Sequence, residues 1–198
     1  MKIFFVRHGK DDENYRGGWS SLGLVSEGVE QAKQLGIYLK EKNAKFDIRK
    51  IVSSDLHRAK ETADILAKEL KLMVTTDARL READNGELAG MRNEEALKKY
   101  PGLFWDTLKA DECYPKGESP NQFFARIKKW FKAFLIECED SEANVLVVTH
   151  GGVINVVYHL VKNMEWSNMK KPVPVSNCSV HVLNTVRMEI YEEKAELQ

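Results

Sequence analysis

"VLVVTHGGVINVVYHLV", residues 145–161, contains the strand, the turn and the helix that predict the fold. Its first four residues are apolar and rich in valine, which is typical of a strand buried on both faces of a parallel sheet. The polar pair Thr149-His150 and the glycine pair Gly151-Gly152 end this run. From Val153 onward the stretch is apolar nearly all round, as expected of a buried helix. A short polar turn thus separates two buried elements.

Other parts of the chain repeat this order of a buried strand followed by a helix. Short apolar runs occupy residues 3–6 and 51–52. The second run precedes apolar positions spaced three and four residues apart, the repeat of one helix face, at Ala59, Ala63, Leu66 and Leu70. A similar pattern covers residues 29–39, where Ser26 is the predicted N-cap, and another covers residues 124–138.

The alternation of strands and helices predicts an α/β protein, a three-layer α/β/α sandwich with a mostly parallel central sheet. Residues 178–184 and 187–193 have the pattern of two further strands. The less regular region at about 84–120 contains three of the five prolines and predicts a helical excursion over one end of the sheet. No linker or repeat divides the chain, so residues 1–198 are expected to form a single domain.

Composition excludes several classes of partner. The 198 residues include 30 basic and 30 acidic side chains, so no overall charge attracts nucleic acid or an anionic membrane. No segment has the ~18 apolar residues needed to cross a bilayer. The three cysteines fit no zinc or redox spacing, and no secretory signal opens the chain. We expect a cytoplasmic protein without a metal, a cofactor, a membrane or a nucleic-acid partner.

Polar residues follow the three predicted strands. The first strand ends in Arg7-His8, the second precedes Arg58, and the third ends in His150-Gly151. Ligands of open α/β sheets bind beyond the carboxyl ends of the strands, so these side chains are expected to meet. The guanidinium fork suits tetrahedral oxyanions, and the helix expected after Gly152 would direct its N-terminus at the same place. Without a nucleotide loop or a metal motif, a neutral imidazole is the available nucleophile for phosphoryl transfer.

Five motifs in a fixed order resemble the histidine phosphatase superfamily, which includes the cofactor-dependent phosphoglycerate mutases. They are RHG at 7–9, SSDLHRAKETA at 53–63, LREADNGELAG at 80–90, KGESPNQFFARI at 116–127 and VTHGG at 148–152. A weaker match is SNCSV at 176–180. The resemblance implies a phosphoglycerate mutase-like sandwich, with the excursion at 84–120 covering the site.

The resemblance also implies the roles of individual residues. His8 matches the nucleophile that becomes a phosphohistidine, and Glu82 matches the carboxyl acid of the mutase-like branch. The group that grips the phosphoryl oxygens is matched by Arg7, Arg58 and His150, with Gly151 beside them and Asn14 as a further phosphate contact. Fixed cations stabilise the charge that spreads over these oxygens in the transition state.

The sequence departs from the family pattern in two places. The family commonly has an acidic residue and then Ser or Thr after RHG, where this chain has Lys10-Asp11. A carboxylate there loses a donor and repels phosphate, so either Asp11 points away or the pocket is weakened or selects differently. The family's usual PLT is replaced by residues 23–25, which shifts the expected N-cap to Ser26 and alters the loop around Trp19.

The leading hypothesis is a metal-independent phosphomonoesterase that hydrolyses a small phosphorylated metabolite and releases inorganic phosphate. The alternative within the same chemistry is a phosphoglycerate mutase, which is disfavoured because the family's mutases are generally longer. Broad-specificity phosphatases and α-ribazole-phosphate phosphatases are similar small members. A different class is a regulatory protein that binds a phosphorylated partner without turnover. The natural substrate and the oligomeric state are left open.

The remaining aromatic and imidazole side chains have structural interpretations. His57 is expected to point away from the site, and His159 and His181 are expected to pack in the buried helix and in a tail strand. The aromatic positions at 124–134 are expected to be core. Trp19, Trp105 and Tyr114 are candidates either for the site entrance or for packing.

Overall fold

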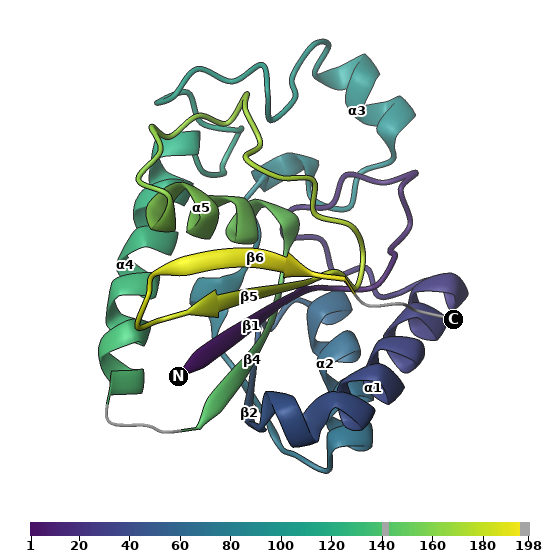
Figure 1. The fold of residues 1–198 in the computed structure, drawn as a ribbon. Helices are drawn as coiled ribbons and strands as arrows, with labels where there is room; N and C mark the ends of the chain where they lie inside the picture. The colour runs from purple at the N-terminus through teal and green to yellow at the C-terminus, as the bar shows by residue number, and fades with distance from the viewer. Residues whose placement is uncertain (140–142, 195–198) are drawn as a thin grey trace.

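One mixed sheet forms the centre of the protein. A computed structural model describes residues 1–139 and 143–194 (Figure 1). In this part of the chain a six-stranded sheet has the order β3-β2-β4-β1-β5-β6. Neighbours among β1 to β4 are parallel, whereas β5 and β6 are antiparallel, which confirms a mostly parallel sheet. The strands are β1 (Lys2–Arg7), β2 (Ile48–Ser53), β3 (Val74–Thr76), β4 (Asn144–Thr149), β5 (Val180–Asn184) and β6 (Glu189–Glu193).

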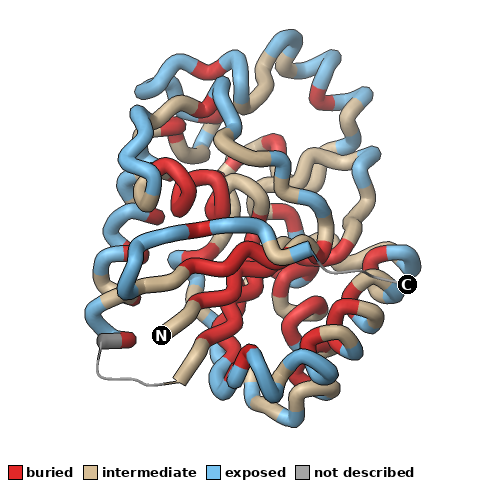
Figure 2. The backbone as a smooth tube through the Cα atoms, in the orientation of Figure 1, coloured by how far each residue is buried: buried red, intermediate tan, exposed pale blue. Residues whose placement is uncertain are grey.

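The central strands are buried on both faces, because alternate side chains enter different cores. In β1, Ile3 and Phe5 pack in one apolar cluster, whereas Phe4 and Val6 pack in the other. Successive side chains of a strand point to opposite faces, so a continuous apolar run fills both cores. Figure 2 shows these strands as buried tube between partly exposed helices.

Helices cover both faces and make the three layers. α1 (Ser26–Phe46) and α2 (His57–Leu70) contribute to the core with Phe4, and α4 (Pro120–Glu139) and α5 (Gly151–Val161) to the core with Phe5. Figure 1 shows the two pairs on opposite sides of the sheet. This arrangement confirms the predicted α/β/α sandwich. No helix in the described ranges is long and apolar enough to cross a membrane.

Two local predictions need correction. Ser26 is the first residue of α1 and not its N-cap; Val25 occupies that position without a side-chain cap. The Val25 amide donates to the carbonyl of Lys10, which fixes the start of the helix against the loop after β1. The strand β3 was not predicted, because Val74–Thr76 is only three residues long and carries no apolar run.

The segment between β3 and α4 is mostly irregular. It contains two short 3-10 helices, η1 (Ala78–Leu80) and η2 (Gly86–Leu88), and the helix α3 (Asn93–Lys99). Its backbone is tied to the loop after β1, since Arg16 donates to the carbonyl of Met91 and accepts from the amide of Gly90. The two loops are therefore held side by side, beyond the sheet at the top of Figure 1.

Candidate active site

Strand pairing brings the polar turn residues together. Arg7 is the register partner of Thr149, and the amide of His8 donates to the Thr149 carbonyl at 3.0 Å. The amide of Ser54, after β2, donates to the Val148 carbonyl at 2.9 Å. The carboxyl ends of β1, β2 and β4 therefore lie at one edge of the sheet, as the sequence predicted.

His8 is buried, and its hydrogen bonds fix its tautomer. Nδ1 lies 2.7 Å from the carbonyl oxygen of Gly9, which can only accept, so Nδ1 bears the proton. Nε2 is consequently a lone pair, and it accepts from Nε of Arg58 at 3.2 Å. Burial, and then the charges of Arg58 and Arg7, lower the pKa of His8 well below its ordinary value. The imidazole is thus neutral and nucleophilic at neutral pH.

Two residues that were not proposed from the sequence hold the backbone of His8 and Gly9. The Gly9 amide donates to Oγ1 of Thr62, which itself donates to the Arg58 carbonyl. Nδ2 of Asn177 donates to the His8 carbonyl at 3.1 Å. The TA of the second motif and the SNCSV match contain these two residues. Both residues lie in motifs that the sequence shows, but no sequence pattern predicts that a side chain will bind the backbone of another segment.

Arg58 lies in the first turn of α2 and is only 2% exposed. Besides His8, its guanidinium donates to the Ser20 hydroxyl at 3.3 Å and to the Gly18 carbonyl at 2.8 Å. The Asp11 carboxylate forms an ion pair with Arg58, in which Oδ2 lies 3.5 Å from Nε. Asp11 therefore faces the pocket, which answers the question that its place after RHG raised.

Arg7 and the start of α5 form the opposite side of the cluster. Nη1 of Arg7 donates to the Val175 carbonyl at 2.7 Å. Gly151 opens α5, and a Cβ built there would lie 3.8 Å from Cδ of Arg7, so the two are neighbours. The helix N-terminus adds amide donors and partial positive charge to the same place.

His150 is fully buried below the cluster. Its ring centroid is 5.1 Å from that of His8, and its Nε2 lies 2.9 Å from the Ser54 hydroxyl. Its Nδ1 is buried and has no hydrogen-bond partner among the described residues. Burial, followed by the charge of Arg58, lowers the pKa of His150 well below its ordinary value. This imidazole is thus neutral, with one nitrogen still free to bind.

Glu82 approaches the cluster from the segment after η1. Its Oε2 accepts from the amide of Gly152 at 3.0 Å, which places the carboxyl at the N-terminus of α5. A Cβ at position 152 would lie 2.2 Å from Oε1 of Glu82, so a side chain there would displace this carboxyl group. The Ala83 amide donates to Oε1 at 3.1 Å. The structure thus joins Glu82 to the turn after β4.

The backbone of Glu82 is held from two directions. Nε1 of Trp19 donates to the Glu82 carbonyl at 2.7 Å, so Trp19 supports this segment rather than lining the entrance. Arg126 of α4 donates to the carbonyls of Arg81 and Glu82, each at 3.0 Å, and forms a two-pronged ion pair with Glu118. This role of Arg126 was not predicted from the sequence, although the residue lies in the fourth motif.

Asn14 is not brought to the cluster. Its side-chain and backbone amides both donate to Oδ1 of Asp12, and its carbonyl accepts from the Asn93 amide. The turn closed by Asp12 leaves the Asn14 side chain exposed. Asn14 does not belong to the walls of the cavities around His8, although the neighbouring Asp11, Asp12 and Glu13 line one of them. The phosphate contact expected of Asn14 stays a prediction.

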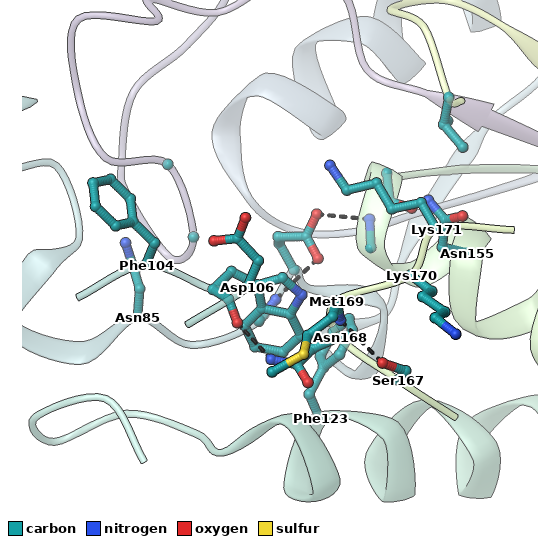
Figure 3. A pocket seen from close by; sticks show the side chains of 18 of the residues that line it. Asn85, Phe104, Asp106, Phe123, Asn155, Ser167, Asn168, Met169, Lys170 and Lys171 are labelled. Carbon is teal, nitrogen blue, oxygen red and sulfur yellow. Dashed lines mark hydrogen bonds between the residues drawn. The ribbon is translucent and has the colours of Figure 1, made fainter. Parts of the chain in front are cut away.

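Two cavities meet at His8. The larger, about 750 Å³, lies between the segment at 104–114 and the loop at 166–175 (Figure 3). The smaller, about 370 Å³, is bounded by the loop at 11–18 and by Arg58. Both include Arg7, His8 and Glu82 in their walls. Trp105 and Tyr114, for which the sequence left open either the site entrance or packing, line the larger cavity.

The other histidines have the expected structural positions. His57 is exposed beside Gly23, and His181 lies buried in β5 between Tyr158 and Ser179. His159 is buried in α5, where its Nδ1 is bonded to the Asn155 carbonyl. His159 also contributes to the wall of the larger cavity, which the sequence did not predict.

Comparison with known proteins identifies the family. The profile of the histidine phosphatase superfamily (branch 1) matches residues 3–195, so the chain belongs to this superfamily. A 2,3-bisphosphoglycerate-dependent phosphoglycerate mutase of Nitrobacter hamburgensis is 32% identical over 171 residues, which cover 82% of this chain and 81% of that protein. A broad-specificity phosphatase of Saccharomyces cerevisiae is 28% identical over 194 residues, with coverage of 94% and 80%.

A solved structure agrees with these relatives. Mycobacterial glucosyl-3-phosphoglycerate phosphatase in complex with VO3 superposes with a TM-score of 0.76 at 28% identity, covering 92% of each chain. The fold and family expected from the five motifs are thereby confirmed. The nearly equal coverage of the Nitrobacter mutase means that this relative is about as long as our chain. Chain length therefore does not separate a phosphatase from a mutase here.

Proposed function

We propose that this protein is a metal-independent phosphomonoesterase that hydrolyses a small phosphorylated metabolite through a phosphohistidine at His8. The observation that supports this most is the state of the His8 imidazole. It is neutral, lies where two cavities meet, and keeps a lone pair on Nε2 that accepts from Arg58. The phosphatase relatives support the same reaction class.

The phosphoryl group would bind where the cations converge. Arg7 and Arg58 donate to its oxygens, together with the amide of Gly151 at the start of α5. His150 donates through Nδ1, the buried nitrogen that has no other partner. Arg58 exchanges its bond to His8 for a phosphoryl oxygen, which frees the lone pair for attack.

In the first step Nε2 of His8 attacks phosphorus, a nitrogen–phosphorus bond forms, and the bond to the leaving oxygen breaks. Protonated Glu82 donates its proton to that oxygen, so the leaving oxygen departs as a neutral hydroxyl group. The charge that accumulates on the equatorial oxygens is stabilised by the fixed cations, and each such preorganised contact is worth ~10²–10³ in rate.

In the second step water attacks the phosphohistidine. Glu82, now a carboxylate, accepts the proton of the water as the oxygen–phosphorus bond forms and the bond to His8 breaks. Inorganic phosphate leaves, and both side chains regain their starting protonation. Water can reach Glu82 from either side, because this residue belongs to the walls of both cavities.

A release assay tests the proposal. Wild type and His8→Ala are given p-nitrophenyl phosphate with and without EDTA. We expect turnover by the wild type that EDTA leaves unchanged and that His8→Ala abolishes. Loss of turnover with EDTA would indicate a metal enzyme. A clean wild-type protein that binds phosphate without turnover would instead be a binding module.

The second candidate function is a phosphoglycerate mutase, because a mutase relative matches 82% of this chain and 81% of its own length. In a mutase the phosphoryl group of His8 passes to the product rather than to water. Incubation of 3-phosphoglycerate with catalytic 2,3-bisphosphoglycerate separates the two reactions. The proposed phosphatase releases inorganic phosphate, whereas a mutase produces 2-phosphoglycerate faster than phosphate.

A further inference from the structure

Arg16 lies in the wall of the larger cavity and carries a donor that is not used. Its Nε is buried and has no hydrogen-bond partner among the described residues, and its guanidinium carbon lies 4.4 Å from the centre of the Phe104 ring. Arg16 and Phe104 both line the cavity that contains His8. No ion pair of Arg16 occurs among the described residues. The cation–π contact with Phe104 attracts the guanidinium but uses none of its hydrogen-bond donors.

Trp166 lines the same cavity and carries a second unused donor. Its Nε1 is buried and has no hydrogen-bond partner in the described part of the chain, while its ring stacks on Phe124 with centroids 4.9 Å apart. Neighbouring amides are occupied, since Asn168 donates to the carbonyls of Trp105 and Leu108. The unpartnered donors are therefore specific to Arg16 and Trp166, because other polar groups around this cavity have hydrogen-bond partners.

Unpaired buried donors are costly, at about 1–3 kcal/mol each. In the described residues the buried side-chain polar atoms without a partner are Arg16 Nε, His150 Nδ1 and Trp166 Nε1. His150 belongs to the proposed phosphoryl site, and the other two line the cavity that opens from it. This distribution is expected of a cavity that binds a ligand rich in acceptors.

The charge of the wall indicates that the acceptor is anionic. Lys170 and Lys171 also line the cavity, and Figure 3 shows them across the view from Phe104. The carboxylates of the wall are Asp106 and Glu82. Asp106, Lys170 and Lys171 are exposed, so water and salt screen all three, whereas Glu82 belongs to the proposed phosphoryl site. A planar guanidinium with free hydrogens binds carboxylate or phosphate oxygens in pairs.

We propose that the substrate has a second oxyanion, a carboxylate or a phosphate, on its alcohol portion, and that Arg16 binds it. This inference rests on the proposed phosphatase function and names the class of its substrate. The aromatic wall formed by Phe104, Trp105, Tyr114 and Trp166 accommodates a bulky body between the two anionic ends. The substrate is then a phosphomonoester of a bulky acidic alcohol.

Matched aryl phosphates test the inference. The value of kcat/KM is measured for phenyl phosphate, for its 3- and 4-carboxy derivatives and for hydroquinone bisphosphate. We expect at least one acidic ester to exceed phenyl phosphate about 10- to 100-fold, the range of a charge-assisted pair. Preference for the carboxylates or for the bisphosphate identifies which oxyanion the site prefers.

Substitutions assign the preference to Arg16. Arg16→Gln is expected to reduce the ratio of acidic to plain ester to within about threefold, and Arg16→Lys to reduce it several-fold while retaining charge. The ratio cancels any general loss of activity. Arg92→Gln is the matched control, because Arg92 is exposed, stacks on Tyr15 and lies outside the cavity wall. Its ratio is expected to equal that of the wild type.

The outcomes separate this inference from the proposed function. A wild type that hydrolyses phenyl phosphate without preferring any acidic ester overturns the inference and leaves the phosphatase intact. A preference that survives in both Arg16 variants also overturns it. A wild type that hydrolyses none of the esters contradicts the proposed function itself.

Discussion

Nε of Arg58 donates to Nε2 of His8 across 3.2 Å, so a buried cation lies against the lone pair proposed to attack phosphorus. This bond holds the imidazole in its reactive tautomer while the site contains no phosphate. In the proposed mechanism Arg58 exchanges this bond for one to a phosphoryl oxygen when substrate binds. Groups that compete with phosphate for Arg58 should therefore control the affinity of the site for phosphate.

Asp11 is such a competitor, because its Oδ2 lies 3.5 Å from Nε of Arg58. Asp11→Ser removes a negative charge that repels phosphate and supplies a hydroxyl donor. We expect the inhibition constant of inorganic phosphate to fall about tenfold, which corresponds to ~1.4 kcal/mol. The measurement is competitive inhibition of p-nitrophenyl phosphate hydrolysis. Asp11→Asn, which removes the charge alone, should give part of the gain, and an unchanged constant in both variants would exclude this role.

Glu82→Gln should separate the two chemical steps. An alkyl phosphate needs a proton on its leaving oxygen, so its hydrolysis should fall by ~10²–10⁴. p-Nitrophenolate leaves without that proton, so phosphorylation of the enzyme by p-nitrophenyl phosphate should lose less. Water attack on the phosphohistidine still lacks its base, so rapid mixing should show a burst of about one p-nitrophenol per enzyme. Equal losses for both substrates and no burst would argue against Glu82 as the acid and base.

Arg126 is predicted to be a positioning residue for Glu82. Arg126→Met removes the donors to the carbonyls of Arg81 and Glu82, and a displacement of about 1 Å at a catalytic group can cost ~10²-fold. We expect kcat to fall 10- to 100-fold with little change in KM. Lys129→Met, on an exposed position of the same helix, is the control. A change in KM alone, or equal effects of both substitutions, would refute the positioning role.

Buried histidines should make stability depend on pH. Burial lowers the pKa of His181 to about 4 and that of His8 and His150 well below the ordinary value near 6.5. The unfolded chain therefore binds protons that the folded chain does not, and stability is lost as the pH falls below about 6.5. For His181 this loss continues down to about pH 4.

Denaturant unfolding between pH 7.5 and 4.5 measures this effect. The variant His181→Gln cannot take up this proton. As the pH falls from 6 to 5, its free energy of unfolding should therefore decrease by about 1 kcal/mol per pH unit less than that of the wild type. His57→Gln is the control, since His57 is exposed. Parallel curves for wild type and His181→Gln would show that His181 is not the source of the pH dependence.

Much of the site was predictable because strand ends are local features that the sheet brings together. The apolar runs before Arg7 and Thr149 indicated buried parallel strands, and parallel pairing then places the residues after them at one edge. The order of the motifs added Glu82, which lies on an irregular segment and has no periodic signal of its own.

The parts that were missed depend on tertiary contacts. Asn14 was assigned by its distance along the chain from His8, whereas its turn with Asp12 decides where it points. The loop at 166–175 has no helical or strand period, so its contribution to the cavity could not be inferred. Arg126 resembles any surface arginine of an amphipathic helix until the carbonyls that it binds are known.

The most direct test of the central claim is to locate the phosphoryl group during turnover. Wild type and Glu82→Gln are mixed with p-nitrophenyl phosphate, quenched at alkaline pH within the first turnover, digested and sequenced by mass spectrometry. The account predicts an alkali-stable, acid-labile phosphate on His8, with more of it in Glu82→Gln. Steady hydrolysis with no phosphate on His8, or undiminished turnover by His8→Ala, would contradict it.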